Sequence, residues 1–187
     1  MRPLLTCLAL LLPVLAFGAD ADEAALWKAL REGGHVALMR HAIAPGVGDP
    51  AGFRLDDCTT QRKLSAQGRA QARAIGERFR ANGITTAAVF SSQWCRCLDT
   101  ARGLALGEVV AFPGLNSFFA DRGEEARHTA AVRALIGERA RSPLPLVLVT
   151  HQVNITALTG VFPASGEIIV LRVDGDTPSV AGRIRTD

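Results

Sequence analysis

Short apolar runs alternate with amphipathic segments along this chain, and that alternation narrows the choice of fold more than any other feature. The runs at residues 35–39, 86–92, 145–151 and 167–173 are nearly continuous and rich in β-branched residues, which is typical of strands buried on both faces of a sheet. Between the first two runs, apolar residues recur at helical spacing over residues 65–83. A strand, a helix and a strand in succession favour parallel strands. The sequence therefore predicts an α/β fold of three layers, a mostly parallel central sheet with helices on both faces.

Residues that start and stop helices divide the segments between these runs. Ser65 is placed to cap the first long helix and Gly83 to end it, because a serine hydroxyl accepts from free backbone N–H groups and glycine tolerates the turn that ends a helix. In the same way, Ser92 is placed to cap the start of the segment "QWCRCLDTARGLAL", and Gly107 is placed to end it. We expect a second helix there.

Two further helices are predicted, at residues 27–34 before the first strand and at residues 130–142 before the third. Residues 113–127 show no period. A loop of that length inside a compact domain is often functional.

The first residues have the layout of a cleaved secretory signal. Arg2 precedes an apolar run over residues 4–17, and small residues follow it; at this length the run is too short to span a bilayer as a helix. We expect cleavage after residue 18, with a cut as late as residue 21 as the alternative. The rest, residues 19–187, is then a single exported domain, periplasmic or secreted in a bacterium, without a stable membrane span.

The charge balance argues against nucleic acid as a partner. The 187 residues carry 21 Lys and Arg against 18 Asp and Glu, a net charge of +3, and no basic run appears. A nucleic-acid binder needs a clustered positive surface. A small phosphorylated substrate is the partner that we expect instead.

Chemically active residues gather at the ends of the predicted strands. Arg40 and His41 follow the first strand, Arg96 lies in the first turn of the helix after the second, and His151 ends the third. Ligands of parallel α/β sheets bind outside the carboxyl ends of the strands. The guanidinium fork of arginine matches phosphate oxygens, and a neutral imidazole can attack phosphorus. The pattern thus predicts phosphoryl transfer that requires neither a metal nor a cofactor.

Four segments carry a resemblance to a known family. In this order and spacing, "LMRHA", "LSAQGRAQA", "VFSSQWCRCLDTA" and "LVTHQ" resemble the histidine phosphatase superfamily, which contains the phosphoglycerate mutases and acid phosphatases. The resemblance implies that His41 is the phosphorylated nucleophile and that Arg40, Arg96 and His151 complete the phosphate pocket. The sequence also resembles small exported bacterial members likened to lipopolysaccharide core heptose phosphatases.

The sequence departs from this family where a general acid would be expected. Asn116 stands where many mutase-like members have a glutamate after the leucine of the middle loop, and Gln152 follows the second histidine in place of an aspartate. We look for the acid in residues 113–127 and choose Asp121, because the apolar pair before it could fold inward. Glu124 and Glu125 are the alternatives.

Two further sets of residues are candidates for shaping the site. Arg54, Gln61 and Arg62 lie in the polar loop after His41 and could line the mouth for the substrate. A disulfide is expected to tie the same loop to the helix that carries Arg96. Cys58 would bond either Cys95 or Cys97, since residues two apart on a helix point about 200° apart, and we favour the pair of Cys58 and Cys97.

Taken together, the sequence predicts a periplasmic, metal-independent phosphomonoesterase that works through a phosphohistidine on His41. The alternative is a phosphate-binding or regulatory pseudoenzyme that keeps the pocket without efficient turnover. The missing acid supports that alternative. A sugar phosphate or a lipopolysaccharide core phosphate is the candidate substrate, on the resemblance alone.

Overall fold

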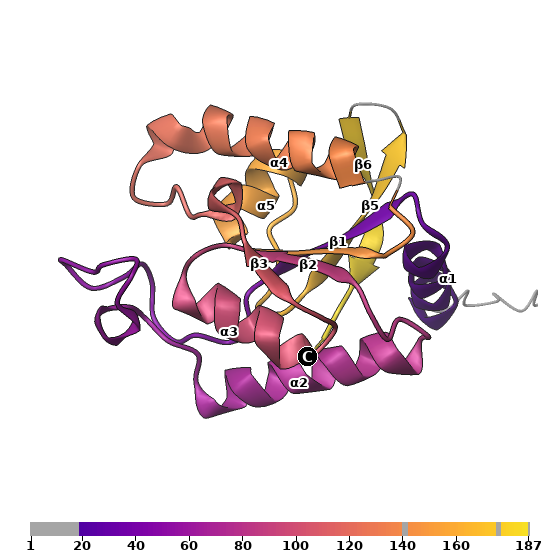
Figure 1. Ribbon diagram of the computed structural model, residues 1–187, viewed down its shortest axis with the longest axis horizontal. Coiled ribbons are helices and arrows are strands. Elements are labelled where there is room, and N and C mark those ends of the chain that lie inside the picture. The colour runs from indigo at the N-terminus through magenta and orange to yellow at the C-terminus, as the bar shows by residue number, and fades with distance from the viewer. Residues whose placement is uncertain (1–18, 140–141, 175–176, 187) are drawn as a thin grey trace, which may run out of the picture.

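One six-stranded sheet organises the molecule (Figure 1). The computed structural model describes residues 19–139, 142–174 and 177–186, so the expected signal segment at residues 1–18 lies outside the described part. The sheet order is β3-β2-β4-β1-β5-β6. Its strands are β1 (His35–Arg40), β2 (Ala88–Ser91), β3 (Val109–Ala111), β4 (Leu146–Thr150), β5 (Ile168–Asp174) and β6 (Thr177–Ile184).

The four strands β3, β2, β4 and β1 run parallel, which confirms the predicted mostly parallel sheet. β4 is inserted between β1 and β2, pairing Leu38 with Leu148 on one side and Phe90 with Leu148 on the other. At the far side of the sheet, β5 pairs antiparallel with β1, and β6 pairs antiparallel with β5. The carboxyl ends of β1, β2 and β4 therefore meet at one edge.

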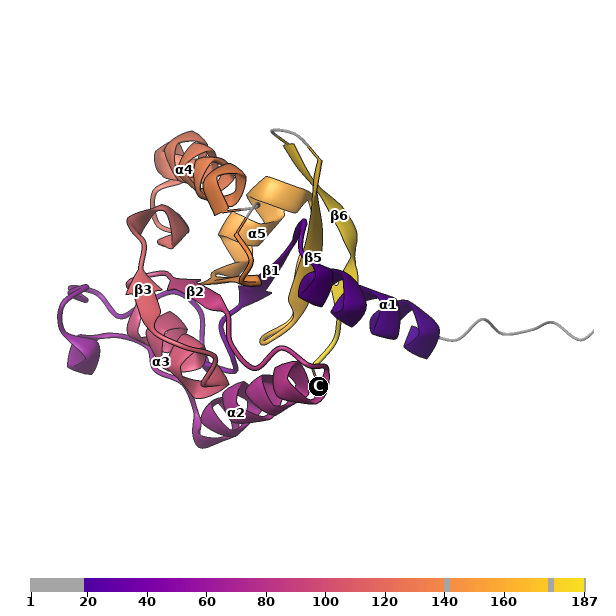
Figure 2. The same ribbon diagram turned by 45° about the vertical axis from the view of Figure 1, so that its right-hand side comes forward.

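Helices cover both faces of the sheet, as predicted (Figure 2). α1 (Ala19–Glu32), α2 (Ala66–Ala81) and α3 (Cys95–Leu104) pack on one face, where Trp27, Phe79 and Leu104 join Met39 in a buried cluster. α4 (Glu125–Arg139) and α5 (Gln152–Thr159) pack on the other, where Ile136 belongs to a second buried cluster. Short 3₁₀ turns, η1 (Cys58–Thr60), η2 (Pro113–Leu115) and η3 (Arg122–Glu124), lie in the loops.

Two glycines bring α2 close to its neighbours. A Cβ at Gly68 would lie 2.0 Å from the carbonyl oxygen of Ile43, and one at Gly76 would lie 2.1 Å from that of Leu104. Only glycine permits backbones to approach so closely. α2 is thereby held against the loop that follows β1 and against the end of α3.

The termini of the helices correct several predictions. Ser65 caps α2 as expected, accepting a hydrogen bond from the backbone N–H of Gly68. Ser92, in contrast, is not the cap of α3, which begins at Cys95 with Trp94 at the N-cap position. α3 ends at Leu104, with Ala105 as its C-cap, before Gly107. The hydroxyl of Ser92 bonds elsewhere, as described below.

Other elements differ in extent. α4 begins at Glu125, earlier than the predicted residue 130, and α1 is longer than the predicted helix at 27–34. β3 and β6 were not predicted, and the predicted strand at 167–173 is antiparallel. Of the helices that the structure describes, none has the length and apolar character needed to cross a membrane.

Candidate active site

His41 follows directly on β1 and is almost fully buried. Its Nδ1 lies 2.8 Å from the carbonyl oxygen of Ala42. Because a carbonyl can only accept, Nδ1 carries the proton and donates it, which leaves the lone pair on Nε2. Burial lowers the pKa of His41 to about 3 against the raising effect of the Ala42 hydrogen bond, and the charges of Arg96 and Arg40 lower it further. The ring is therefore neutral and can act as a nucleophile.

Two arginines beside His41 have unused donor capacity. Arg40 donates from Nη1 to the carbonyl oxygen of Pro163 at 3.0 Å, and Arg96 is only 3% exposed. The Nε atoms of both are buried without a hydrogen-bond partner. A buried donor left unpaired costs free energy, and a phosphate group would satisfy such donors with matching geometry.

His151 follows β4 and faces His41 edge to face, with 5.6 Å between ring centroids. Its Nδ1 lies 3.4 Å from Nη2 of Arg96, which can only donate, and its Nε2 lies 2.8 Å from Oγ of Ser92. Nδ1 thus accepts from Arg96 and Nε2 donates to Ser92. Burial, then the charge of Arg96, places the pKa of His151 well below its ordinary value.

Ser92 connects His151 by hydrogen bonds to the middle loop, residues 113–127. Its hydroxyl donates to Oδ1 of Asn116 at 3.3 Å, and that oxygen also accepts from the backbone N–H of Gln93. Asn116, noted in the sequence as the residue in place of an acid, therefore helps to orient His151 through Ser92.

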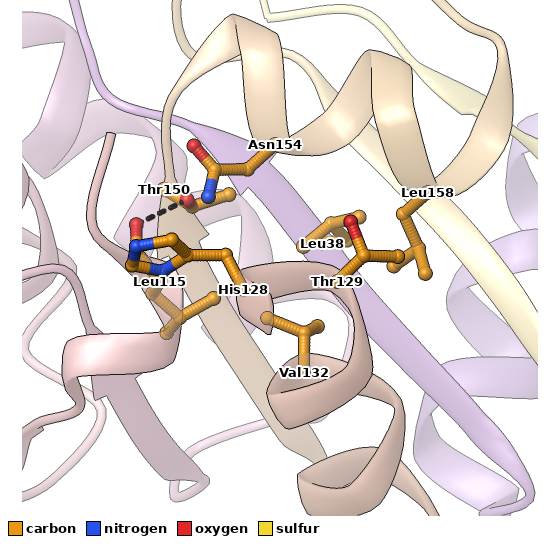
Figure 3. Close-up of a pocket in the computed structure, with 8 residues that line it drawn as sticks. All are labelled: Leu38, Leu115, His128, Thr129, Val132, Thr150, Asn154 and Leu158. Carbon is orange, nitrogen blue, oxygen red and sulfur yellow. Dashed lines mark hydrogen bonds between the residues drawn. The ribbon is translucent and has the colours of Figure 1, made fainter. Parts of the chain in front are cut away.

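The middle loop is fastened to the sheet from behind (Figure 3). The hydroxyl of Thr150 donates to the backbone carbonyl oxygen of Leu115 at 2.7 Å, the contact dashed in Figure 3. The side-chain amide of Asn154 donates to the backbone carbonyl oxygen of Asn116 at 2.8 Å. His128 of α4 donates from Nδ1 to the carbonyl oxygen of Gly114. The cavity between these side chains measures about 10 Å³, which suffices for one water molecule, so it is not the substrate site.

A carboxylate that the sequence did not single out, that of Asp49, lines the same cavity as the two histidines. Asp49 forms a buried ion pair with Arg96, with Oδ1 2.8 Å from Nη1. It also accepts from Nε1 of Trp94 and from the backbone N–H of Arg62. Burial alone would raise the pKa of Asp49, but the hydrogen bond and charge of Arg96, with the other two donors, keep it below its ordinary value.

These groups form the floor of a cavity of about 520 Å³. That volume is within the usual range for small-molecule sites. Polar residues on the lining include Arg40, His41, Asp49, Arg62, Arg96, Ser117, His151 and Gln152. Its apolar residues are Val47, Phe53, Trp94, Phe119, Ala120, Val153 and Phe162.

Of the three residues predicted at the mouth, only Arg62 lines the cavity. It donates to the carbonyl oxygens of Gly48 and Ala44 and so shapes the loop that carries Asp49. Gln61 is buried and holds backbone groups, among them the N–H of Cys95. Arg54 is exposed and pairs with Asp57. The predicted mouth role is wrong for Gln61 and Arg54.

The predicted general acid does not reach the cavity. Phe118 turns inward and Phe119 reaches the cavity, but Asp121 is exposed and its carboxylate caps η3 by accepting from the N–H of Gly123. Among the alternatives, Glu124 pairs with Arg127, and Glu125 is the first residue of α4. None of these three acids lines the site.

The disulfide joins Cys58 to Cys95, and the predicted pairing with Cys97 is wrong. Cys97 is free and fully buried, with Sγ 3.7 Å from the carbonyl oxygen of Thr150 and 3.4 Å from Nε2 of His151. The helix does separate the two cysteines, as expected, and its geometry turns Cys97 toward the sheet. The bridge fastens the loop after β1 to the start of α3.

Metal ligands do not cluster in the part of the chain that the structure describes. No group of three or more His, Cys, Asp or Glu side chains there is arranged to hold a metal ion.

The sequence and the fold were compared with known proteins. Residues 36–124 match the family described as "Histidine phosphatase superfamily (branch 1)"; this range includes Arg40, His41 and Arg96. Among curated proteins, none matches the chain.

Solved structures share the fold at low sequence identity. The protein histidine phosphatase SixA, complexed with tungstate, is 17% identical with a TM-score of 0.59, over 81% of this chain and 97% of that one. Phosphoserine phosphatase from Entamoeba histolytica is 14% identical with a TM-score of 0.60, over 82% and 98%. Mycobacterial glucosyl-3-phosphoglycerate phosphatase is 20% identical with a TM-score of 0.52, over 73% and 92%. Over residues 36–124 the chain is therefore similar to the histidine phosphatase superfamily, and its fold is the one that these solved structures share.

Proposed function

We propose that this protein is an exported phosphomonoesterase that cleaves its substrate through a phosphohistidine on His41. One observation carries the proposal: Nδ1 of His41 is held by the carbonyl of Ala42, so the lone pair of Nε2 is available in a cavity where Arg40 and Arg96 each have a buried, unpaired Nε donor. Such an arrangement holds a phosphate and offers it a nucleophile.

The reaction has two steps. Nε2 of His41 attacks phosphorus, an N–P bond forms, and the P–O bond to the leaving group breaks with its electron pair on oxygen. A water molecule then attacks phosphorus, the N–P bond returns its electrons to Nε2, and the water proton goes to solvent as inorganic phosphate leaves. Arg40, Arg96 and His151 bear on the same phosphate and stabilise the charge that grows on its oxygens.

The low pKa of His41 supports its role. An imidazole with a pKa of about 3 is neutral over the whole physiological range, so no proton has to leave before attack. As a phosphate dianion enters, its charge raises the pKa of both histidines. His151 then gains a proton on Nδ1, the atom that accepts from Arg96 in the structure, and can donate to a phosphate oxygen.

Location and substrate are parts of the proposal that rest on other grounds. The signal-like layout of residues 1–18 supports export to the periplasm. The resemblance to lipopolysaccharide core heptose phosphatases supports a sugar or core phosphate. The neighbouring structures, a protein histidine phosphatase and phosphatases of phosphoserine and glucosyl-3-phosphoglycerate, support a small phosphorylated group more generally.

Trapping of the phosphoenzyme tests the proposal. The protein without residues 1–18 is mixed with a ³²P-labelled phosphate ester and quenched in alkali, where a phosphohistidine survives, and a parallel sample is quenched in acid, where it is lost. We expect acid-labile label in the parent protein and none in His41→Ala, together with loss of turnover. His35→Ala, at the other end of β1, is the matched control and should keep both signals.

Any of three results would contradict the proposal. Turnover above a few per cent of the parent rate in His41→Ala would remove the nucleophile. Tight phosphate binding with neither turnover nor label, even on p-nitrophenyl phosphate, would favour the phosphate-binding pseudoenzyme. Loss of activity with EDTA, restored by a metal, would refute the metal-independent mechanism.

A further inference from the structure

The mouth of the active-site cavity is unusually apolar for a surface. Among the described residues, six large hydrophobic side chains are exposed, and the three most exposed of them, Val47 (87%), Phe162 (68%) and Phe119 (48%), all line this cavity. Single exposed apolar residues are ordinary. Three gathered at the mouth of one polar site indicate a binding surface.

These side chains come from three separate loops. Val47 and Phe53 belong to the loop after β1, Phe119 to the loop before η3, and Phe162 to the loop after α5. Phe53 also packs on Trp94, with 5.5 Å between ring centroids, and Trp94 lies edge to face with His151 at 5.3 Å. An apolar surface therefore continues from the phosphate floor to the mouth.

Among the described residues of the cavity, no free carboxylic acid is placed to protonate the leaving group, and in the proposed mechanism the proton of His151 goes to a non-bridging phosphate oxygen. Of the described residues that line it, Asp49 is the one with a carboxyl group. Both oxygens of Asp49 accept hydrogen bonds, from Arg96 and the Arg62 backbone on one side and from Trp94 on the other. A carboxyl group in this position acts as an anion that holds Arg96, and protonating it would break these contacts.

These two observations bear on the leaving group of the substrate. We propose that the site cleaves aryl phosphate monoesters, with the aromatic ring against the apolar mouth and a phenolate that departs without a proton from the protein. The inference rests on the phosphohistidine mechanism of the proposed function, and it puts an aryl ester in place of the sugar or core phosphate as the substrate. As the N–P bond to His41 forms, the P–O bond breaks, the phenolate keeps the electron pair, and it takes a proton from water at the mouth.

The preference has a physical basis. A phenol such as that of tyrosine has a pKa of about 10, so its anion is a far better leaving group than the alkoxide of a sugar or glycerol. General acid catalysis supplies about 10²- to 10⁴-fold for poor leaving groups. A site without it therefore discriminates between the two classes of ester by about that factor.

Leaving-group dependence is the first arm of the test. The parent protein is assayed for kcat/KM on phenyl phosphate, glycerol 2-phosphate and glucose 6-phosphate. We expect phenyl phosphate to be cleaved about 10²- to 10⁴-fold faster than both alkyl esters. Rates within about tenfold of one another would show that an acid operates, and would overturn the inference while leaving the phosphohistidine mechanism in place.

Binding is the second arm, and it does not depend on turnover. Calorimetry compares benzylphosphonate, methylphosphonate and inorganic phosphate on the parent, Phe119→Ala and Phe162→Ala. We expect benzylphosphonate to bind more tightly than methylphosphonate, and each variant to lose about three- to tenfold for benzylphosphonate with no change for phosphate. Leu144→Ala, exposed and outside the cavity, is the control and should change none of these values.

Each outcome separates the inference from the proposed function. Equal affinity for the two phosphonates, or equal losses for benzylphosphonate and phosphate in the variants, would overturn the inference. Tight benzylphosphonate binding in a protein that forms no phosphoenzyme would retain the aryl site and reject the hydrolase.

Discussion

Acidification should weaken the folded protein through its two buried histidines. His41 and His151 are neutral in the fold, because burial places their pKa values far below the ordinary 6.5. In the unfolded chain both rings take up a proton as the pH falls below 6.5. The unfolded state then binds more protons than the folded state, so the free energy of unfolding is greatest above pH 6.5 and declines as the pH drops toward the folded pKa of about 3.

The size of the effect follows from these values. At about pH 5 the folded His41 is still neutral for any folded pKa below about 4, so the loss depends on the unfolded value and amounts to about 2 kcal/mol relative to about pH 7.5. Burial and the charge of Arg96 also lower the pKa of His151, so this residue contributes a loss in the same direction. Over this interval His41→Gln should therefore lose about 2 kcal/mol less stability than the parent protein.

Urea unfolding at the two pH values measures this difference. The buffers must contain no phosphate, because an anion bound between the arginines raises the pKa of both rings. His35→Gln is the control, since this residue lies at the opposite end of β1 with its ring partly in solvent, and should decline as the parent does. If His41→Gln lost as much stability as the parent, His41 would be protonated in the folded protein. The assignment of an unprotonated Nε2 with a free lone pair would then be wrong.

Three other predictions concern residues around the site. Asp49→Asn leaves the buried charge of Arg96 without its partner and should lower the free energy of unfolding by about 3–5 kcal/mol. Added phosphate should then raise the melting temperature of the variant more than that of the parent. An equal rise would contradict the role of Asp49 as the partner of Arg96. In protein without residues 1–18, denatured but not reduced, thiol titration should find one thiol, that of Cys97; three thiols would refute the bridge. The double variant Cys58→Ser, Cys95→Ser should lower the free energy of unfolding by on the order of 3–4 kcal/mol in the chain-entropy model. Asp121→Asn should leave kcat/KM unchanged on both phenyl phosphate and glycerol 2-phosphate, because Asp121 lies outside the cavity; a selective loss on the alkyl ester would restore it as the acid.

Hydrophobic period was enough to predict the centre of the fold. β1 and β4 are buried along their length, so their apolar runs are continuous and visible in the sequence. β3 has three residues, two of them exposed, and β6 carries Pro178 and mostly exposed positions at the sheet edge, so neither gives a strong period. The reversed direction of β5 depends on the path of the loop after α5, which periodicity does not describe.

The close approach of Arg40, His41, Arg96 and His151 was predictable for a geometric reason. These residues lie at or just after the carboxyl ends of strands of one sheet, and parallel strands bring these ends together whatever the loops do. Asp49 lies in an irregular loop, where position is set by tertiary contacts with Arg96 and Trp94. The prediction of Asp121 as the acid was wrong because its position also depends on an irregular loop. Phe118 points inward, but the chain has turned outward again by Asp121, and the Asp121 carboxylate accepts from the backbone N–H of Gly123.

The sheet order also determines when this active site can exist during synthesis. β1 leads directly into His41, the proposed nucleophile, yet its neighbours in the sheet are β4 and β5, both encoded more than a hundred residues later. A nascent chain that has reached the end of α4 holds Arg40, His41 and Arg96 but has no strand to join β1 to β2. Contacts this distant in sequence form late and slowly. A chain cut before residue 146 should therefore neither fold nor bind phosphate, and a chain threaded through a membrane channel would reach the far side before its reactive histidine is assembled.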